Sequence, residues 1–207
     1  MGLLGQSTTA WCVFAYLVAA IPVGLVIGRL RGVDLRAIGS GNIGATNAVR
    51  ALGRKWGAAV FLLDVLKAFG PVALAARADA LGGVSEPESA IAWVGAAATL
   101  GHIYPIYLRF RGGKGVACAL GVFFAILPLS GLLAVILYAQ TLILTRVSAL
   151  GSLTAVNAAT LHILVSDAPA PYKLLALGLS ALIFWRHRSN IREAMARARA
   201  HRRDTTP

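Results

Sequence analysis

The sequence predicts an all-α, polytopic membrane protein that folds as a single bundle of about seven transmembrane helices. Composition gives two of the reasons, because 57 % of the 207 residues are hydrophobic and only 14 % are charged, against about 45–50 % and 25 % in soluble domains. The third reason is the pattern, in which apolar runs of roughly 20 residues alternate with short segments rich in Lys and Arg. These features exclude a disordered chain, a coiled coil and an ordinary soluble globule.

Each predicted helix is an apolar run bounded by charge, proline or glycine. One run, from Gly115 to Thr145, contains no charged residue and is too long for a single untilted helix. Because Pro128 interrupts it near the middle, we predict two short helices there. The spans follow from the runs Trp11–Gly28, Trp56–Ala76, Ile91–Leu108, Gly115–Thr145 (split at Pro128), Val147–Val165 and Tyr172–Trp185.

The basic residues set the predicted orientation, since cytoplasmic loops of membrane proteins carry an excess of Lys and Arg. With seven spans and the N-terminus outside, 17 of the 20 Lys and Arg residues fall on the cytoplasmic side, and the C-terminus is cytoplasmic. No charged residue precedes Arg29, whereas a signal peptide carries positive charge before its apolar stretch, so the first run is expected to remain as a span. Residues 1–195 are expected to form one transmembrane domain and residues 196–207 a basic cytoplasmic tail.

Three polar, glycine-rich segments fall on the predicted cytoplasmic side, and the first is Gly39–Arg50. Glycines allow backbone N–H groups to approach an anion closely, and Arg50 adds a planar guanidinium suited to phosphate. The neutral donors in this segment are Ser40, Asn42, Thr46 and Asn47. The alternative is a flexible interfacial turn whose arginine is placed by topology alone.

The second segment, Gly101–Gly115, ends in a compact cationic turn that should open a helix. The N-terminus of a helix favours an anion, and Lys114 would add a point charge. The alternative is an ordinary cytoplasmic loop with hairpin glycines. His102, near the end of the preceding span, is expected to be a satisfied interhelical hydrogen-bonding residue rather than a catalyst.

The third segment, Trp185–Arg192, closes the last span. His187 and Asn190 are three residues apart and share a helix face, so they could accept from and donate to a substrate hydroxyl; a basic interfacial helix end is the alternative. Ser148 and Ser152 lie at the same predicted depth, where helix packing through small residues is the default interpretation and hydrogen bonding to a substrate the other.

Charged residues inside the second span need a partner, because charge is costly at membrane depth. Asp64 and Lys67 lie on one helical face and are predicted to form a structural ion pair, with support of an active site as the second possibility. Cys12 and Cys118 form no disulfide framework, and the sequence has no ligand spacing typical of a zinc or other metal site. The residues thus indicate a membrane protein that handles a phosphorylated substrate; a transporter for phosphate or a small phosphorylated solute is the alternative.

These segments together resemble the bacterial acyl-phosphate:glycerol-3-phosphate acyltransferases, the PlsY family. The resemblance runs from about Val18 to Met195 and rests on four motifs, Gly39–Arg50, Gly101–Ala117, Arg146–Ser148 and His187–Ile191. It implies a multi-pass protein of the bacterial cytoplasmic (inner) membrane with its active site on the cytoplasmic side, in which residues 1–195 form the acyltransferase domain.

The resemblance also implies the reaction. A fatty acyl group passes from acyl phosphate to the 1-hydroxyl of glycerol 3-phosphate, giving lysophosphatidic acid and phosphate in phospholipid biosynthesis. The implied partners are fatty acyl phosphate, glycerol 3-phosphate and membrane lipids, with no nucleic acid, no metal and no cofactor. Because acyl phosphate is already activated, orientation and charge stabilisation suffice and no acyl-enzyme is expected. The base is left open between His187 and the departing phosphate.

Site roles follow from the same resemblance. The expected catalytic residues are Ser40, Arg50, Lys114, His187 and Asn190. The expected substrate-binding residues are Gly41, Asn42, Gly44, Thr46, Asn47, Gly112, Gly113, Gly115, Ser148 and Ser152. The chain departs from the family pattern at Ile43, where proline is common, at Ala68, where glycine is frequent, and at Ser189, where the family often has glutamate.

Overall fold

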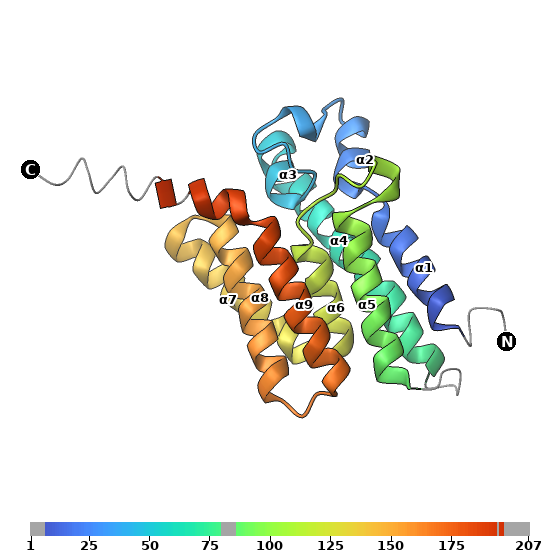
Figure 1. Cartoon of the computed structure of the whole chain (residues 1–207). Helices are drawn as coiled ribbons and strands as arrows, with labels where there is room; N and C mark the ends of the chain where they lie inside the picture. Colours follow the sequence, from blue (N-terminus) through green and yellow to red (C-terminus); the bar gives the residue numbers. More distant parts are fainter. Residues whose placement is uncertain (1–6, 80–85, 194, 197–207) are drawn as a thin grey trace, which may run out of the picture.

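The computed structural model describes residues 7–79, 86–193 and 195–196, so the predicted basic tail falls outside it apart from residue 196. All regular structure in the described ranges is helical, and the helices pack side by side in one bundle (Figure 1). The α-helices are α1 Thr8–Ala20, α2 Val23–Leu30, α3 Ala45–Leu52, α4 Arg54–Asp79, α5 Pro87–Ile103, α6 Val116–Ile126, α7 Pro128–Thr145, α8 Ser148–Val165 and α9 Ala170–Arg186; two 3₁₀ turns are η1 Leu35–Ala37 and η2 Ile106–Leu108.

The helices have the length and composition of a membrane protein. Within the described residues, five segments are long and apolar enough to cross a membrane: Thr8–Leu30, Arg54–Ala78, Pro87–Leu108, Pro128–Thr145 and Ser148–Val165. Helix α6 is apolar but has only 11 residues. The predicted break of the long uncharged run is confirmed, because α6 ends at Ile126 and α7 begins at Pro128.

The first predicted span, by contrast, is not one continuous helix. Pro22 separates α1 from α2, because proline has no N–H to continue the helical ladder and disfavours helical geometry in the residue before it. The carbonyl of Ile21 accepts a hydrogen bond from Lys67 Nζ at 2.8 Å instead. Lys67 also pairs with Asp64 at 2.9 Å, which confirms the predicted ion pair. The buried ammonium thus satisfies both a carboxylate and a backbone group at the break.

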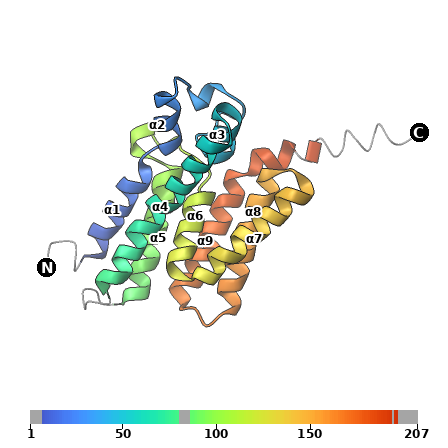
Figure 2. The ribbon, with the colours of Figure 1, turned by 180° about the vertical axis from the view of Figure 1, so that it is seen from behind.

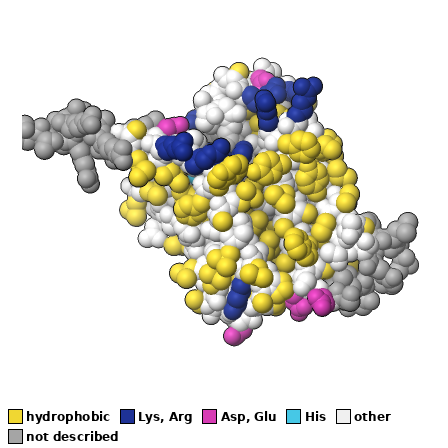
Figure 3. All heavy atoms as spheres, viewed as in Figure 1, with side chains coloured by type: hydrophobic (Ala, Val, Ile, Leu, Met, Phe, Trp, Pro, Cys, Tyr) yellow, Lys and Arg dark blue, Asp and Glu magenta, His cyan; other side chains and the backbone are white. Residues whose placement is uncertain are grey.

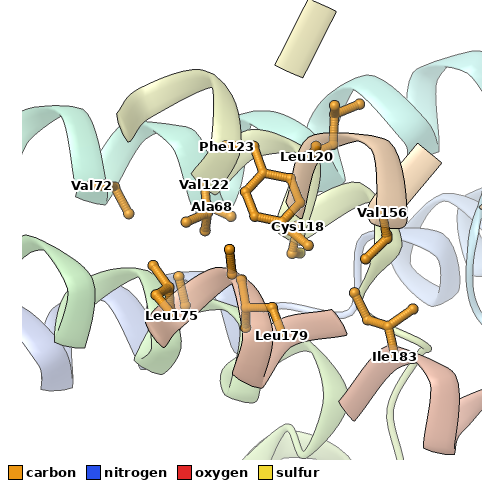
Figure 4. Close-up of a cluster of buried hydrophobic side chains, with 14 of the residues drawn as sticks. Ala68, Val72, Cys118, Leu120, Val122, Phe123, Val156, Leu175, Leu179 and Ile183 are labelled. Atoms are coloured by element: carbon orange, nitrogen blue, oxygen red, sulfur yellow. The ribbon is translucent and has the colours of Figure 1, made fainter. Parts of the chain in front are cut away.

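A tightly packed apolar core lies between helices α4, α6, α8 and α9. Figure 4 shows Phe123 and Cys118 of α6 among side chains of α4, α8 and α9. Helices α4 and α6 pack backbone to backbone, since a Cβ added at Gly121 would lie 2.2 Å from the Val65 carbonyl oxygen. Small residues allow such close approach in membrane bundles. Both cysteines are free, and the Cys118 thiol donates to the Asp64 carbonyl oxygen at 3.2 Å.

The polar segments meet at one end of the bundle. Helices α2 and α3, the start of α6 and the end of α9 all lie at that end in two opposite views (Figures 1 and 2). Most of the Lys and Arg side chains visible in Figure 3 also gather toward it. We call this region, formed by residues 29–55, 104–116, 145–149 and 185–193, the basic end.

Candidate active site

A cavity of about 430 Å³ extends from the basic end into the bundle. Its polar lining includes Ser40, Asn42, Gly44, Thr46, Lys114, Gly115, Ser148, Ser152 and His187. Its apolar lining includes Phe61, Leu120, Phe123, Ala134, Val135 and Val156. Phe123 lies about two turns into α6 from Val116, so the cavity passes from charged to apolar surroundings along its depth.

Asn47 organises the first segment from inside. Its side chain is buried, and its Nδ2 lies at hydrogen-bonding distance from the carbonyl oxygens of Leu35 (2.8 Å), Ile38 (3.0 Å) and Asn42 (2.9 Å). Its Oδ1 accepts from the backbone N–H of Ser40 at 3.1 Å. These contacts use the donors of the amide and engage its oxygen, so the side chain holds the loop. Asn47 also lines the cavity, and its expected binding of substrate stays a prediction.

The loop that Asn47 holds owes its path to glycine and to a buried apolar anchor. Gly41 has a φ of +67°, which favours glycine, and it does not line the cavity. Asn42 Oδ1 accepts from the Gly44 N–H at 3.0 Å, and α3 begins directly after Gly44. Ile43 is buried against α2, where a Cβ at Gly24 would lie 1.9 Å from the Ile43 carbonyl oxygen. Helix α2 therefore supports the loop that presents Ser40 and Asn42 to the cavity.

The glycines of the second segment position the turn rather than line the cavity. The N–H groups of Gly112 and Gly113 donate to the carbonyls of Ile103 and His102, each at 3.1 Å. Their own carbonyls accept from Arg186 Nη2 at 3.2 Å and 3.1 Å. These backbone groups are paired within the protein and neither glycine lines the cavity, which favours a role in positioning the turn. Direct substrate binding by Gly112 and Gly113 stays a prediction.

The part of this turn that does face the cavity is its end. Gly115 has a φ of +88° and begins α6, whose first residues Val116 and Ala117 line the cavity with Lys114. The amino-terminal amides of α6 have no intrahelical partner and favour an anion. Burial lowers the pKa of Lys114, which is partly offset by the carboxylate of Glu193.

His187 and Asn190 come from the end of α9 and the helical turn that follows. Lys114 Nζ donates to Asn190 Oδ1. His187 Nδ1 lies 2.8 Å from the Ile183 carbonyl oxygen, and because a carbonyl only accepts, Nδ1 carries the proton. Burial lowers the pKa of His187, and the nearby Lys114 charge adds to the effect. The imidazole is therefore neutral near pH 7, with Nε2 able to accept a proton.

Three hydroxyl groups from three helices form a hydrogen-bonded row, the hydroxyl chain, on the cavity wall. Ser148 Oγ lies 2.9 Å from Thr46 Oγ1 and 3.0 Å from the Tyr138 hydroxyl. Ser152 Oγ donates to the Ser148 carbonyl oxygen at 2.9 Å. Thr46, Ser148 and Ser152 were expected here, whereas Tyr138 was missed; the available signal was a phenol close to Gln140 and Thr141 in a largely apolar span.

His102 and Asp64 lie beneath the second segment and also line the cavity. Both side chains are buried, and His102 Nδ1 lies 3.7 Å from Asp64 Oδ1. Asp64 Oδ1 is paired with Lys67, whereas His102 Nδ1 has no hydrogen-bond partner among the described residues. The expectation that His102 is a satisfied hydrogen-bonding residue is therefore not met at Nδ1, since Asp64 Oδ1 lies 3.7 Å away, beyond hydrogen-bonding distance.

Two expected residues stand beside the cavity rather than in its lining. Arg50 is exposed on α3, and its charge contributes to lowering the pKa of Lys114. Asn190 reaches the cavity through its contact with Lys114. Arg54, at the start of α4, does line the cavity and was missed, although its spacing of four residues from Arg50 was visible in the sequence. Within the described ranges, no group of three or more His, Cys, Asp or Glu side chains could hold a metal ion.

Comparison with known sequences assigns a family to this arrangement. Residues 9–197 match the family model described as glycerol-3-phosphate acyltransferase. The glycerol-3-phosphate acyltransferase of Aquifex aeolicus is 42 % identical over 190 residues, which cover 92 % of this chain and 96 % of that protein. The enzyme of the same name from Myxococcus xanthus is 44 % identical over 185 residues, covering 89 % and 94 %.

Solved structures show the same architecture. Crystal structures of PlsY (YgiH), described as an integral membrane glycerol 3-phosphate acyltransferase, exist in a glycerol 3-phosphate form and a lysophosphatidic acid form. They superpose on this chain with TM-scores of 0.86 and 0.84 at 41 % and 40 % identity, each covering 92 % of this chain and 93 % of the other. This chain is therefore a multi-pass membrane protein and belongs to the glycerol-3-phosphate acyltransferase family.

Proposed function

We propose that this enzyme transfers a fatty acyl group from acyl phosphate to the 1-hydroxyl of glycerol 3-phosphate, releasing lysophosphatidic acid and inorganic phosphate. The observation that carries the proposal is a single cavity with a cationic, hydroxyl-lined mouth and an apolar interior. Such a cavity suits one substrate that is wholly polar and one that combines a phosphate with a long acyl chain. The solved relatives are described as glycerol 3-phosphate and lysophosphatidic acid forms, which are a substrate and a product of this reaction.

The phosphate groups would bind at the mouth. Lys114 and the amino-terminal amides of α6 supply positive charge on one side, and Ser40, Asn42 and the start of α3 supply neutral donors on the other. Arg50 and Arg54 add charge at the rim. Helix N-termini and guanidinium groups are both suited to phosphate oxygens.

The acyl chain would occupy the apolar interior. Helix α6 has 11 residues and is about 16 Å long, roughly half the thickness of the hydrocarbon core. On either side of it, Phe61 of α4 and Val135 of α7 line the cavity, each with 39 % of its area accessible. An acyl chain that enters from the bilayer between α4 and α7 would lie along Leu120 and Phe123.

The chemistry requires orientation more than a nucleophilic residue. The glycerol 3-phosphate hydroxyl oxygen attacks the acyl carbonyl carbon, the bond from that carbon to the phosphate oxygen breaks, and phosphate leaves. His187 Nε2 could hold the hydroxyl and accept its proton, which would then pass to the departing phosphate. In the alternative route, the departing phosphate takes the proton from the hydroxyl directly. Lys114 stabilises charge that develops on the leaving phosphate.

We also propose seven spans, with the N-terminus outside and the basic end in the cytoplasm of a bacterium. Support comes from the charge distribution, because the loops of the basic end carry most of the arginines and lysines of the described chain. Soluble glycerol 3-phosphate would then reach the mouth from the cytoplasm, and acyl phosphate would reach the interior from the inner membrane.

The test is an assay of the purified protein in a lipid phase with both substrates. Phosphate release should depend strictly on glycerol 3-phosphate and should yield lysophosphatidic acid in equal amount. Lys114→Ala should lower activity by more than tenfold, on the scale of a lost charged contact in the transition state of about 2.7–4 kcal/mol. Solute uptake without acyl transfer, or normal turnover of a folded Lys114→Ala variant, would contradict the proposal.

A further inference from the structure

Arg186, the last residue of α9, is joined to the cationic turn by two hydrogen bonds. Its Nη2 donates to the consecutive carbonyls of Gly112 and Gly113, at 3.2 Å and 3.1 Å. The guanidinium carbon also lies 5.8 Å from the centre of the Tyr104 ring and 5.9 Å from that of Trp185. The group is thus held by two aromatic rings while it binds the turn.

The other side of the turn is fixed by α5. The amides of Gly112 and Gly113 donate to the last carbonyls of that helix, so the two residues are clamped between α5 and Arg186. Lys114 follows immediately, and its ammonium reaches Asn190, four residues beyond Arg186. His187 is the residue next to Arg186 in sequence. The spacing between the candidate cation and the candidate base therefore depends on this clamp.

We infer that Arg186 is a positioning residue, which holds Lys114 and the first amides of α6 in place for phosphate without touching the substrate itself. This inference rests on the proposed function, because it assigns phosphate binding to Lys114. The arginine is not explained by packing alone, since its Nε is buried with no hydrogen-bond partner among the described residues. A buried, unpaired donor costs stability that an apolar side chain would not.

The side chain also has to be arginine. Guanidinium presents several donors in a fixed plane and stacks on aromatic rings, whereas an ammonium is a single point on a flexible stem. A lysine at position 186 would reach one carbonyl at most in a comparable geometry and would lose the planar contact with Tyr104. We therefore expect Arg186→Lys to recover the charge without recovering the full clamp.

Arg188 provides a matched control. It lies two residues away, carries the same charge, stacks on the same Trp185 ring at 4.3 Å and donates to a backbone carbonyl, that of Trp185 at 3.0 Å. It is exposed, and it does not line the cavity. Comparing Arg186→Gln with Arg188→Gln therefore separates loss of the clamp from loss of one positive charge at the basic end.

The experiment measures inorganic phosphate binding by calorimetry, then steady-state kinetics and thermal unfolding. Arg186→Gln should weaken phosphate binding about tenfold or more and should lower kcat/KM at least as much. This is the scale expected when hydrogen bonds to a charged group are lost and Lys114 is misplaced. Arg188→Gln should stay within about twofold of the wild type in both, the range of a screened surface charge. Equal effects of the two substitutions would overturn the inference, as would a lower melting temperature for Arg186→Gln with unchanged phosphate affinity and KM.

Two further arms keep the result decisive. If Arg186→Gln does not fold, Arg186→Lys carries the test, with an expected weakening of about threefold for the loss of one contact; wild-type phosphate affinity in that variant would contradict the inference. Phosphate binding needs no turnover, so it tests Arg186 separately from the reaction. A wild-type protein that binds phosphate but transfers no acyl group would reject the proposed function, whereas the Arg186 comparison would still stand.

Discussion

Replacing Gly113 by alanine is a perturbation whose consequence follows directly from the packing. The φ of Gly113 is not in the left-handed region, so alanine is compatible with the backbone. The obstacle is His102, because an added Cβ would lie 2.1 Å from His102 Nε2 and 2.9 Å from Cε1. His102 is 5 % exposed and has Asp64 behind it, so the ring cannot withdraw without disturbing a buried charge.

The added methyl group therefore has to displace the turn. Overpacking of this kind costs about 1–3 kcal/mol of stability. The effect on activity should be larger than the effect on folding, since Lys114 is the next residue and a shift of about 1 Å can lower a rate by as much as 100-fold. We expect Gly113→Ala to lower kcat/KM at least tenfold while the protein still folds.

The assay is phosphate release with each substrate varied in turn, alongside thermal unfolding in the same detergent. Gly178→Ala is the matched control, because a Cβ at Gly178 meets no atom within 4 Å. That variant should keep wild-type kinetics and an equal or higher melting temperature. Wild-type KM and kcat in Gly113→Ala would refute the conclusion that His102 and the turn are in rigid contact.

Three other substitutions test separate parts of the site. Tyr138→Phe removes one member of the hydroxyl chain and should raise the KM for glycerol 3-phosphate about two- to tenfold with little change in kcat, the scale of one hydrogen bond; an equal rise in the KM for acyl phosphate would contradict this role. The pKa of His187 is lowered from its ordinary value of about 6.5, so the imidazole becomes protonated only below pH 6.5. We therefore expect kcat/KM to fall only below that pH, and His187→Asn should remove this acidic limb of the pH profile. Lys67→Met leaves the buried Asp64 carboxylate without its ammonium partner and should destabilise the protein by about 3–5 kcal/mol, whereas an unchanged melting temperature would show that the ion pair is dispensable.

The helices were predictable because hydropathy needs no knowledge of tertiary contacts. The runs that lie between charged segments form α4, α5, α7, α8 and α9. Within the long uncharged run, α6 ends at Ile126 and α7 begins at Pro128, as the proline predicts. Pro22 has the same chemistry, but the sequence did not predict a break there, since membrane helices tolerate proline when another group satisfies the freed carbonyl. That group is Lys67, and its position 46 residues away could not be read from the run itself.

The residue types of the candidate site were predictable from the sequence, whereas the role of each residue was less so. Glycine, asparagine and lysine marked segments that the fold brings together around one cavity. Whether Asn47 faces a ligand or its own loop depends on where three carbonyls point, which is decided by the folded turn. The roles of Gly112 and Gly113 depend on Arg186, which is 74 and 73 residues away in the chain. Residue type thus predicts a phosphate site, while tertiary hydrogen bonds decide which of its residues are left to face the cavity.

The central claim is that one cavity holds both phosphorylated substrates, with the phosphate at Lys114 and the acyl chain in the apolar interior. A crystal structure with a non-hydrolysable acyl phosphonate tests it most directly. We predict that the phosphonate lies within hydrogen-bonding distance of Lys114 Nζ and that the chain passes Leu120 and Phe123 between α4 and α7. A phosphonate bound away from the basic end, or a chain lying on another face of the bundle, would contradict the account.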